Sequence, residues 1–321
     1  MPRKFLIDTD TASDDAVAIL MALRWPDVQV EAITVVSGNV PVEMGTRNAL
    51  YTAQMCASDV PVYVGAAHPL VRETEDATWF HGRDGMGDMN YPAPDRAPES
   101  KHAVDAIIDT IKANPGIEMI TLAPLTNVAL AVSHAPEIVA NVSRCIVMGG
   151  AACTVGNVTP SAEFNVWCDP EAARIVFHSG LPIEMVGWEL ARHEANLYPE
   201  EMTAIRAFGT PLAHFALDCN RRALEAGQEQ SGDPGLGLCD PVAMAVALDP
   251  SVVTRKSQCY VEVEAQSELT RGMTVVDQLG VADDARNRNV WSALVKREPN
   301  VSVCWEINVP RWKEMLKRVL R

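Results

Sequence analysis

The chain has 321 residues, of which 48% are hydrophobic, so it can bury a large core and can form a single α/β domain at this length. Its net charge is −15, from 42 acidic and 27 basic residues, and it has no basic stripe, which argues against nucleic acid or an anionic membrane as a partner. No apolar run approaches the ~20 residues that span a bilayer, and Met1–Lys4 meets Asp8 too soon for the apolar region of a signal peptide.

The first predicted strand ends in an acidic turn. The apolar run Phe5–Ile7 comes before this turn and the apolar-rich segment Ala16–Leu23 follows it, which predicts a strand, a turn and a helix. Four aspartates lie within the eight residues of the turn: Asp8, Asp10, Asp14 and Asp15. Carboxylates this close stay ionised together only around a positive charge, and a hard cation with oxygen ligands is the natural candidate. A solvated acidic turn with a helix cap is the alternative.

Strands and helices alternate through the first two thirds of the chain. This alternation predicts an α/β fold with an open, mainly parallel sheet, helices on both faces and a single domain over residues 1–321. Ligands bind outside the carboxyl ends of the strands in such sheets, and Asp10, Asn39, Thr126 and Gly149 all fall at such ends. The predicted strands are 28–36, 60–64, 118–122, 145–148 and 182–186, and the predicted helices are 41–57, 103–112, 127–132 and 170–178.

Two segments interrupt this pattern. Residues 66–100 are rich in Pro, Gly and charge and contain Trp79–Gly87. A loop this long is usually functional or disordered, and its aromatic residues indicate that it closes on a ligand. The polar, Gly-rich stretch 227–237 predicts a second, mobile loop. The remaining predicted elements are helices over 199–226 with a break near 209–211, 242–248 and 312–320, and strands over 258–264 and 301–307.

Eight cysteines are spread over the chain, and none forms a Cys-x-x-Cys pair. This spacing favours a reducing compartment over a disulfide framework or a zinc site. We therefore expect the protein to be cytoplasmic.

A second polar constellation lies in the turn-rich stretch 156–165. Amides and a carboxylate at Asn157, Glu163 and Asn165 suit the recognition of several hydroxyls, as on a sugar, although ordinary turn chemistry is the alternative. Asp169 before Pro170 is typical of a helix N-cap, and Asp240 before Pro241 has the same pattern. On this pattern alone, Asp240 is a cap or a ligand.

Taken together, these motifs resemble the inosine–uridine-type nucleoside hydrolases. The resemblance rests on Asp8-Thr9-Asp10 with Asp14-Asp15, and on Ala162–Asn165 with Asp169–Ala172. It covers most of the chain in order, and weaker matches support it: His81-Gly82, Ala123–Asn127, Met148–Gly150, Asp240-Pro241, Arg271-Gly272 and Asp277.

The resemblance implies hydrolysis of the N-glycosidic bond of ribonucleosides with Ca²⁺ as cofactor. The residues that match Asp10, Asp15 and Asp240 hold Ca²⁺ by their carboxylates, and the one that matches Thr126 does so by its backbone carbonyl. Asp10 also accepts a proton from the attacking water. The expected substrate contacts are Asp14, Asn39, His81, Met148, Asn157, Glu163, Phe164, Asn165 and Asp240. Relatives in the family are commonly homodimers or homotetramers.

The residue chemistry agrees with this interpretation. Cleavage of a ribosyl C1′–N bond builds positive charge on the sugar, and a carboxylate-rich pocket stabilises that charge. Oxygen donors without a His cluster favour calcium over zinc. We expect Asp10 and Asn39 to act in catalysis, with Cys239 and His81 as further candidates.

Cys239 departs from the family pattern, because many members have His directly before Asp-Pro and assign it to protonation of the leaving base. A thiol is a weak donor and more often behaves as a small buried hydrophobe, so we expect a structural Cys239. A subgroup of the family carries Cys at this place. The leaving base then needs another source of a proton, with His81, Arg221, Arg222, the 227–237 loop or a water as candidates.

Three other interpretations fit the sequence less well. A nucleoside or pentose sensor would keep the calcium site without turnover, and the complete set of acidic residues argues against it. A phosphatase of the haloacid-dehalogenase kind would place Thr at the position of Ala12. The usual EF-hand is excluded because Ala12 occupies the fifth loop position counted from Asp8 and no Gly follows.

Overall fold

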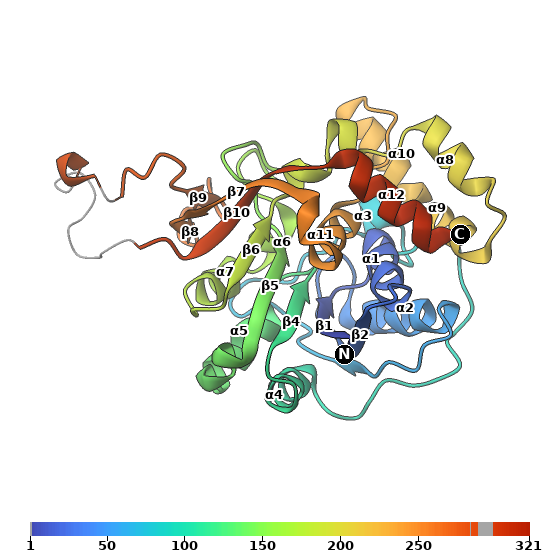
Figure 1. Ribbon diagram of the computed structural model, residues 1–321, viewed down its shortest axis with the longest axis horizontal. Helices are drawn as coiled ribbons and strands as arrows, with labels where there is room; N and C mark the ends of the chain where they lie inside the picture. The colour runs from blue at the N-terminus through green and yellow to red at the C-terminus, as the bar shows by residue number, and fades with distance from the viewer. Residues whose placement is uncertain (1, 283, 288–297) are drawn as a thin grey trace.

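The centre of the structure is an eight-stranded sheet in the order β3-β2-β1-β4-β5-β6-β10-β7 (Figure 1). This computed structural model describes residues 2–282, 284–287 and 298–321. All neighbouring strands run parallel except β10 and β7, so the predicted open, mainly parallel sheet is confirmed. The strands are β1 (Arg3–Thr9), β2 (Val28–Val35), β3 (Val62–Val64), β4 (Ile117–Thr121), β5 (Val142–Met148), β6 (Ile183–Val186), β7 (Val253–Cys259) and β10 (Val301–Ile307).

Helices cover both faces of this sheet, as predicted. Side chains alternate between the two faces of a strand, so neighbours in β1 enter different cores. Phe5 and Ile7 pack in one apolar cluster, and Leu6 packs in the other. The first cluster involves α1 (Ser13–Leu23), α2 (Val42–Met55), α9 (Pro211–Asp218), α11 (Cys239–Leu248) and α12 (Val309–Leu320). The second involves α4 (Ala103–Ala113), α5 (Thr126–His134) and α7 (Pro170–Phe177).

The chain changes direction across the sheet beside β1. It builds β1, β2 and β3 outward in one direction and then returns to place β4 on the other side of β1. A parallel sheet opens a crevice at such a switch point, outside the carboxyl ends of the two strands. The acidic turn follows β1 at this end, and the start of α5 follows β4.

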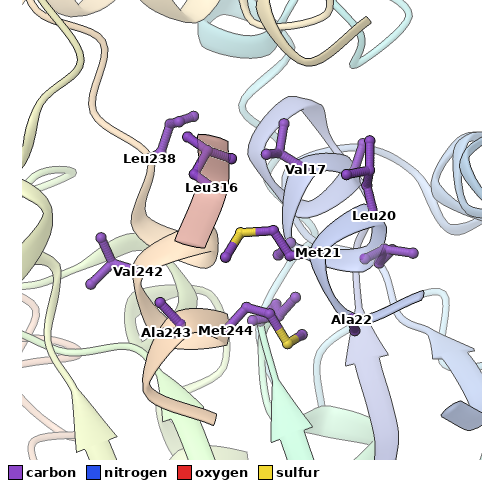
Figure 2. Packing of buried hydrophobic residues seen from close by; sticks show 14 of the residues in the cluster. Val17, Leu20, Met21, Ala22, Leu238, Val242, Ala243, Met244 and Leu316 are labelled. Carbon is purple, nitrogen blue, oxygen red and sulfur yellow. The ribbon is translucent and has the colours of Figure 1, made fainter. Parts of the chain in front are cut away.

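Helices α1 and α11 pack side by side although more than 200 residues separate them (Figure 2). Met21 of α1 and Met244 of α11 extend into the space between the two helices, with Leu316 of α12 near them. Both helices begin at the crevice, so this apolar contact fixes the distance between Asp14 and Asp15 at the start of α1 and Asp240 at the start of α11.

The opposite end of α11 is anchored by arginines from the amino ends of two strands. Arg3 donates to the carbonyls of Ala247 and Leu248, at 2.5 and 2.9 Å. Arg144 lies on the same helix end and pairs with Glu118 and Glu184, at 3.0 and 2.9 Å. Cations at a helix C-terminus complement the helix dipole and satisfy free carbonyls.

Two predictions about the C-terminal third need correction. The predicted strand 258–264 is wrong as a single element, because the chain leaves the edge strand β7 at Cys259 and pairs β8 (Val261–Val263) with β9 (Thr274–Val276). Most of β7 is exposed, so its polar sequence hid it from apolar patterning. The helical prediction 199–226 holds as α8 (Pro199–Arg206), α9 and α10 (Arg221–Ser231).

The predicted loop over 227–237 is wrong for its first half, because α10 continues to Ser231 and ends at Gly232 with a φ of 75°. Beyond Gly232, the backbones of Leu197 and Leu236 exchange two hydrogen bonds of 2.9 Å. The predicted loop 66–100 is correct apart from the short helix α3 (Thr78–His81).

Replacing Arg144 with Met should destabilise the fold by about 2 kcal/mol, because it leaves Glu118 and Glu184 without a shared partner in a largely buried site. Urea denaturation measures this change. Burial alone would raise the pKa of Glu184, but its hydrogen bonds and ion pairs with Arg144 and Lys256 together lower that pKa below the ordinary value. Their stabilisation is therefore present above the ordinary glutamate pKa and is lost as the pH falls through the lower folded value.

Lys101→Met is the matched control for Arg144→Met, since Lys101 makes an exposed ion pair with Asp109 far from the helix end. It should leave the denaturation midpoint unchanged. Equal midpoints for Arg144→Met and the wild type would contradict the anchoring role.

Candidate active site

Three carboxylates converge where α1 and α11 begin. One oxygen each from Asp14, Asp15 and Asp240 lies within 4.8 Å of the others. Thr9 Oγ1 and the Ala12 backbone N–H donate to Asp15, at 2.5 and 3.0 Å, and fix its orientation. The positive ends of both helix dipoles point at this cluster. Such a group of oxygen donors can bind a metal ion.

Burial and mutual repulsion raise the pKa values of the carboxyl groups at this site. Burial, followed by the charges of Asp15 and Asp14, raises the pKa of Asp240 well above its ordinary value. Burial and the charge of Asp14 raise the pKa of Asp15 to about 6. Burial and the charge of Asp15 raise the pKa of Asp10 well above its ordinary value. These shifts reflect mutual repulsion in a desolvated site, which a bound cation would relieve.

Of the two roles that the sequence pattern allows for Asp240, a cap or a ligand, the structure contradicts the cap. Helix α11 has Leu238 at its N-cap and no side-chain hydrogen bond that caps it. The Asp240 carboxylate faces the acidic cluster, and its backbone N–H lies 3.5 Å from Asp14 Oδ2. Asp169, in contrast, caps α7 as predicted, since its carboxylate accepts from the Ala172 N–H at 3.0 Å.

Asp10 is held by the turn that follows β2. The Asn39 backbone N–H donates to Asp10 Oδ2 at 2.5 Å, and Asn39 Nδ2 lies 3.4 Å from Oδ1. Gly38 makes this approach possible, because a Cβ there would lie 2.1 Å from Asp10 Oδ2 and 2.7 Å from Pro124. The sequence placed Asn39 at the end of a strand but gave no sign of this requirement for Gly38.

Asp8 and Thr126 form hydrogen bonds that join the strands and helices around the crevice. Asp8 Oδ1 accepts from Thr34 at 2.6 Å and from Asn127 at 2.9 Å, which ties β1 to β2 and to α5. These two bonds leave Asp8 in a supporting position beneath the acidic turn. The Thr126 hydroxyl donates to Asp169 at 2.6 Å, which joins the starts of α5 and α7.

The Glu163–Asn165 stretch opens the short helix α6 (Phe164–Cys168). Glu163 caps this helix by accepting from the N–H groups of Asn165 and Val166, at 2.9 and 3.3 Å, and it also accepts from Gly150 at 2.8 Å. Burial raises its pKa to about 7.

Asn165 joins this stretch to the ends of two strands. Its amide donates to the carbonyls of Leu122 after β4 and Met148 at the end of β5, at 3.1 and 3.3 Å. Asn157 accepts from the Phe164 N–H at 2.9 Å. The second constellation and the end of β5 therefore form one structural unit.

His81 ends α3 and is buried against the acidic turn. Its Nδ1 lies 2.7 Å from Ser13 Oγ and 3.9 Å from Asp14 Oδ1. Burial lowers its pKa, which the charge of Asp14 offsets in part. Ser13 was missed in the sequence, because nothing local shows that a loop 68 residues later returns to it.

Cys239 is half-buried and packs against the apolar cluster around α1 and α11. Burial, followed by the charge of Asp14, raises the pKa of its thiol well above the ordinary value. The group is therefore a neutral thiol at neutral pH. All eight cysteines are free.

A groove of about 810 Å³ runs along the outer side of α3. Trp79, which is 61% exposed, lines it together with Arg47, Arg83 and Arg222. Trp79 therefore lies at the surface of the protein and not in its core. Within the described residues, no helix is long and apolar enough to cross a membrane.

Comparison with known proteins shows which family this chain resembles. The family described as inosine-uridine preferring nucleoside hydrolase matches residues 5–314. The pyrimidine-specific ribonucleoside hydrolase RihA of Shewanella sp. (strain ANA-3) is 37% identical over 297 residues, which cover 90% of this chain and 91% of that protein.

Two solved structures are similar over almost their whole length. A plant nucleoside hydrolase, the PpNRh1 enzyme, has a TM-score of 0.91 and 31% identity, over 100% of this chain and 99% of its own. A purine-preferring ribonucleoside hydrolase from Gardnerella vaginalis has a TM-score of 0.87 and 32% identity, over 99% and 98%. The chain therefore belongs to the inosine-uridine preferring nucleoside hydrolase family and is an enzyme that hydrolyses the N-glycosidic bond of ribonucleosides.

Proposed function

We propose that Asp10 is the base of this hydrolysis. The proton of the attacking water passes to Asp10, the water oxygen bonds to C1′ of the ribose, and the C1′–N bond breaks with its electron pair on the base. The observation that supports this role is the placement of Asp10 beside the three-carboxylate cluster, with Oδ2 held by Asn39 at 2.5 Å. Oδ1 lies 3.4 Å from Asn39 Nδ2 and can accept a proton.

Ca²⁺ is the proposed cofactor, held by the carboxylates of Asp10, Asp15 and Asp240 and by the backbone carbonyl of Thr126. The donor set consists of oxygens, as Ca²⁺ prefers, and burial with mutual repulsion leaves the carboxylates in need of positive charge. When bound, the ion would supply that charge and bind the ribose 2′- and 3′-hydroxyls. Asp14, whose carboxylate joins the same cluster, contacts the sugar in this proposal.

The other side of the ribose is assigned to the unit around α6. Glu163 and Asn165 form hydrogen bonds to backbone atoms that fix their orientation, and Met148 lies beside Asn165. Asn39, Asn157 and Phe164 complete the proposed contacts. The carboxylates of the acidic cluster stabilise the positive charge that develops on the sugar in the transition state. The named relatives include pyrimidine-specific and purine-preferring enzymes, so the proposal covers ribonucleosides as a class.

His81 is the proposed proton donor to the leaving base, and Cys239 is proposed to be structural. His81 is buried and lies near Asp14, whereas Cys239 packs against the apolar cluster and carries a neutral, weakly donating thiol. We propose further that residues 1–321 act as one domain, which the family match over 5–314 supports. The resemblance supports a homodimer or homotetramer, and the free cysteines support a cytoplasmic location.

Asp10→Asn should lower the turnover of ribonucleosides by about 10²- to 10⁴-fold, because it removes the proton acceptor and keeps the shape of the side chain. A reducing-sugar assay with adenosine, guanosine, inosine, cytidine and uridine measures ribose release. Asp109→Asn, at an exposed acid far from the crevice, is the control and should keep wild-type rates. Full activity of Asp10→Asn would remove Asp10 as the base.

Asp240→Asn should raise the melting temperature of the EGTA-treated protein, because it neutralises one of several buried carboxylates that repel one another. It should also abolish the stabilisation of the wild type by added Ca²⁺, which is about 2.7 kcal/mol at a hundredfold excess over Kd. Differential scanning fluorimetry with Ca²⁺ and with Mg²⁺ measures both effects. Equal Ca²⁺ shifts in the two proteins would exclude Asp240 as a ligand.

Cys239→Ala should lower turnover by less than about tenfold, since loss of a true general acid costs about 10² to 10⁴. His81→Gln should show the larger loss. Steady-state kinetics on the best nucleoside of the panel compare the two variants. A greater loss for Cys239→Ala than for His81→Gln would reverse the two assignments.

A further inference from the structure

Helix α6 has only five residues, yet it begins with Phe164 and Asn165 and carries Glu163 as its N-cap. A helix this short has no stability of its own, because nucleation costs more than its few hydrogen bonds return. Its orientation therefore depends on groups outside it. At its N-terminus, the N–H groups are satisfied by Glu163 itself. The last carbonyls of a helix need partners as well.

Arg271 supplies those partners. Its Nε donates to the carbonyl of Trp167 at 3.0 Å, and its Nη2 lies 3.4 Å from the carbonyl of Cys168. The guanidinium also lies over the indole ring of Trp167, with 4.3 Å between Cζ and the ring centroid. One planar cation thus contacts the backbone and a side chain at the C-terminus of α6, where the helix dipole favours positive charge.

The segment that carries Arg271 contacts the Glu163 unit at two more points. A Cβ at Gly272 would lie 2.5 Å from Trp167 Cα, so the backbone of Gly272 packs directly on α6. Thr274 Oγ1 accepts from the Ala151 N–H and donates to the Ala151 carbonyl, both at 2.9 Å. Residue 150, next to Ala151, donates its N–H to Glu163. The segment Arg271–Thr274 therefore supports both sides of Glu163.

We propose that Arg271 is a positioning residue for ribose recognition: it fixes α6, and through α6 it fixes Glu163 and Asn165. This inference rests on the proposed sugar contacts of those two residues. Arg271 itself makes no contact with substrate in this scheme. The role requires arginine, because lysine has no planar fork to reach the carbonyls and stack on Trp167 together.

Hydrogen exchange of the backbone amides in residues 164–168 tests the structural half of the proposal without any substrate. Arg271→Met should speed exchange in this segment by at least tenfold while exchange in α1 stays unchanged. Arg255→Met is the matched control, because Arg255, on the exposed edge strand β7, also lies over a tryptophan ring, that of Trp305 in β10. The control should leave exchange in residues 164–168 unaltered.

Kinetics on the best nucleoside of the panel test the functional half. Glu163 and Asn165 contact the ribose before and during the reaction, so Arg271→Met should raise KM by about tenfold and change kcat by less than threefold. Arg271→Lys should fall between Arg271→Met and the wild type in both readouts, and it serves alone if Arg271→Met does not fold. Arg255→Met should keep wild-type kinetics.

Wild-type exchange and wild-type KM in Arg271→Lys and Arg271→Met would overturn the proposal. An equal rise in exchange throughout the sheet would also overturn it, since that result indicates general destabilisation. If α6 exchanges faster in Arg271→Met but KM does not change, the sugar contacts assigned to Glu163 and Asn165 fail and the support of α6 by Arg271 stands. The two failures are therefore distinguishable.

Discussion

The repulsion among buried carboxylates at one end of the sheet is the constraint on which the rest of this structure depends. Asp10, Asp14, Asp15 and Asp240 occupy a desolvated site that raises the pKa of three of them. Two helix N-termini partly offset this cost. Interactions elsewhere in the fold offset the rest of this free-energy cost. Helices α1 and α11 bury an extensive apolar contact, and arginines bind the C-terminal end of α11. Stability is thus concentrated at the amino ends of the strands and function at their carboxyl ends.

The crevice has two sides with different origins. The acidic side consists of helix starts that are anchored deep in the core, at α1 and α11. The proposed sugar side consists of a five-residue helix and a glycine turn, which are short elements that depend on their neighbours. Arg271 and Thr274, from a small hairpin outside the main sheet, provide that support. The small β8-β9 sheet thus supports the proposed sugar side, although none of its side chains takes part in the proposed chemistry.

His81 and Cys239 lie near the acidic cluster on different elements, and only His81 has a proton-donating role in the proposed mechanism. The position before Asp240 carries a thiol that packs like a small hydrophobe. His81 arrives from a loop, is buried, and lies against Ser13 in the turn that carries Asp14. The histidine thus approaches the acidic cluster from α3 rather than from α11, and the protein keeps an imidazole near the cluster by a different route.

The sequence by itself determined the elements whose signals are local. The order of strands and helices, the acidic turn after β1 and the cap at Asp169 all follow from patterns within about ten residues, because hydrogen bonds inside a turn or a helix end depend on neighbours in the chain. The resemblance to a family supplied the candidate site residues. Only the tertiary structure decided that Asp240 faces Asp14 across 226 positions, that β7 is a polar edge strand, and that α10 extends to Ser231. Packing of α1 on α11 and of Arg271 on Trp167 joins segments whose separation in sequence carries no pattern, so their contacts arise only when the core is assembled.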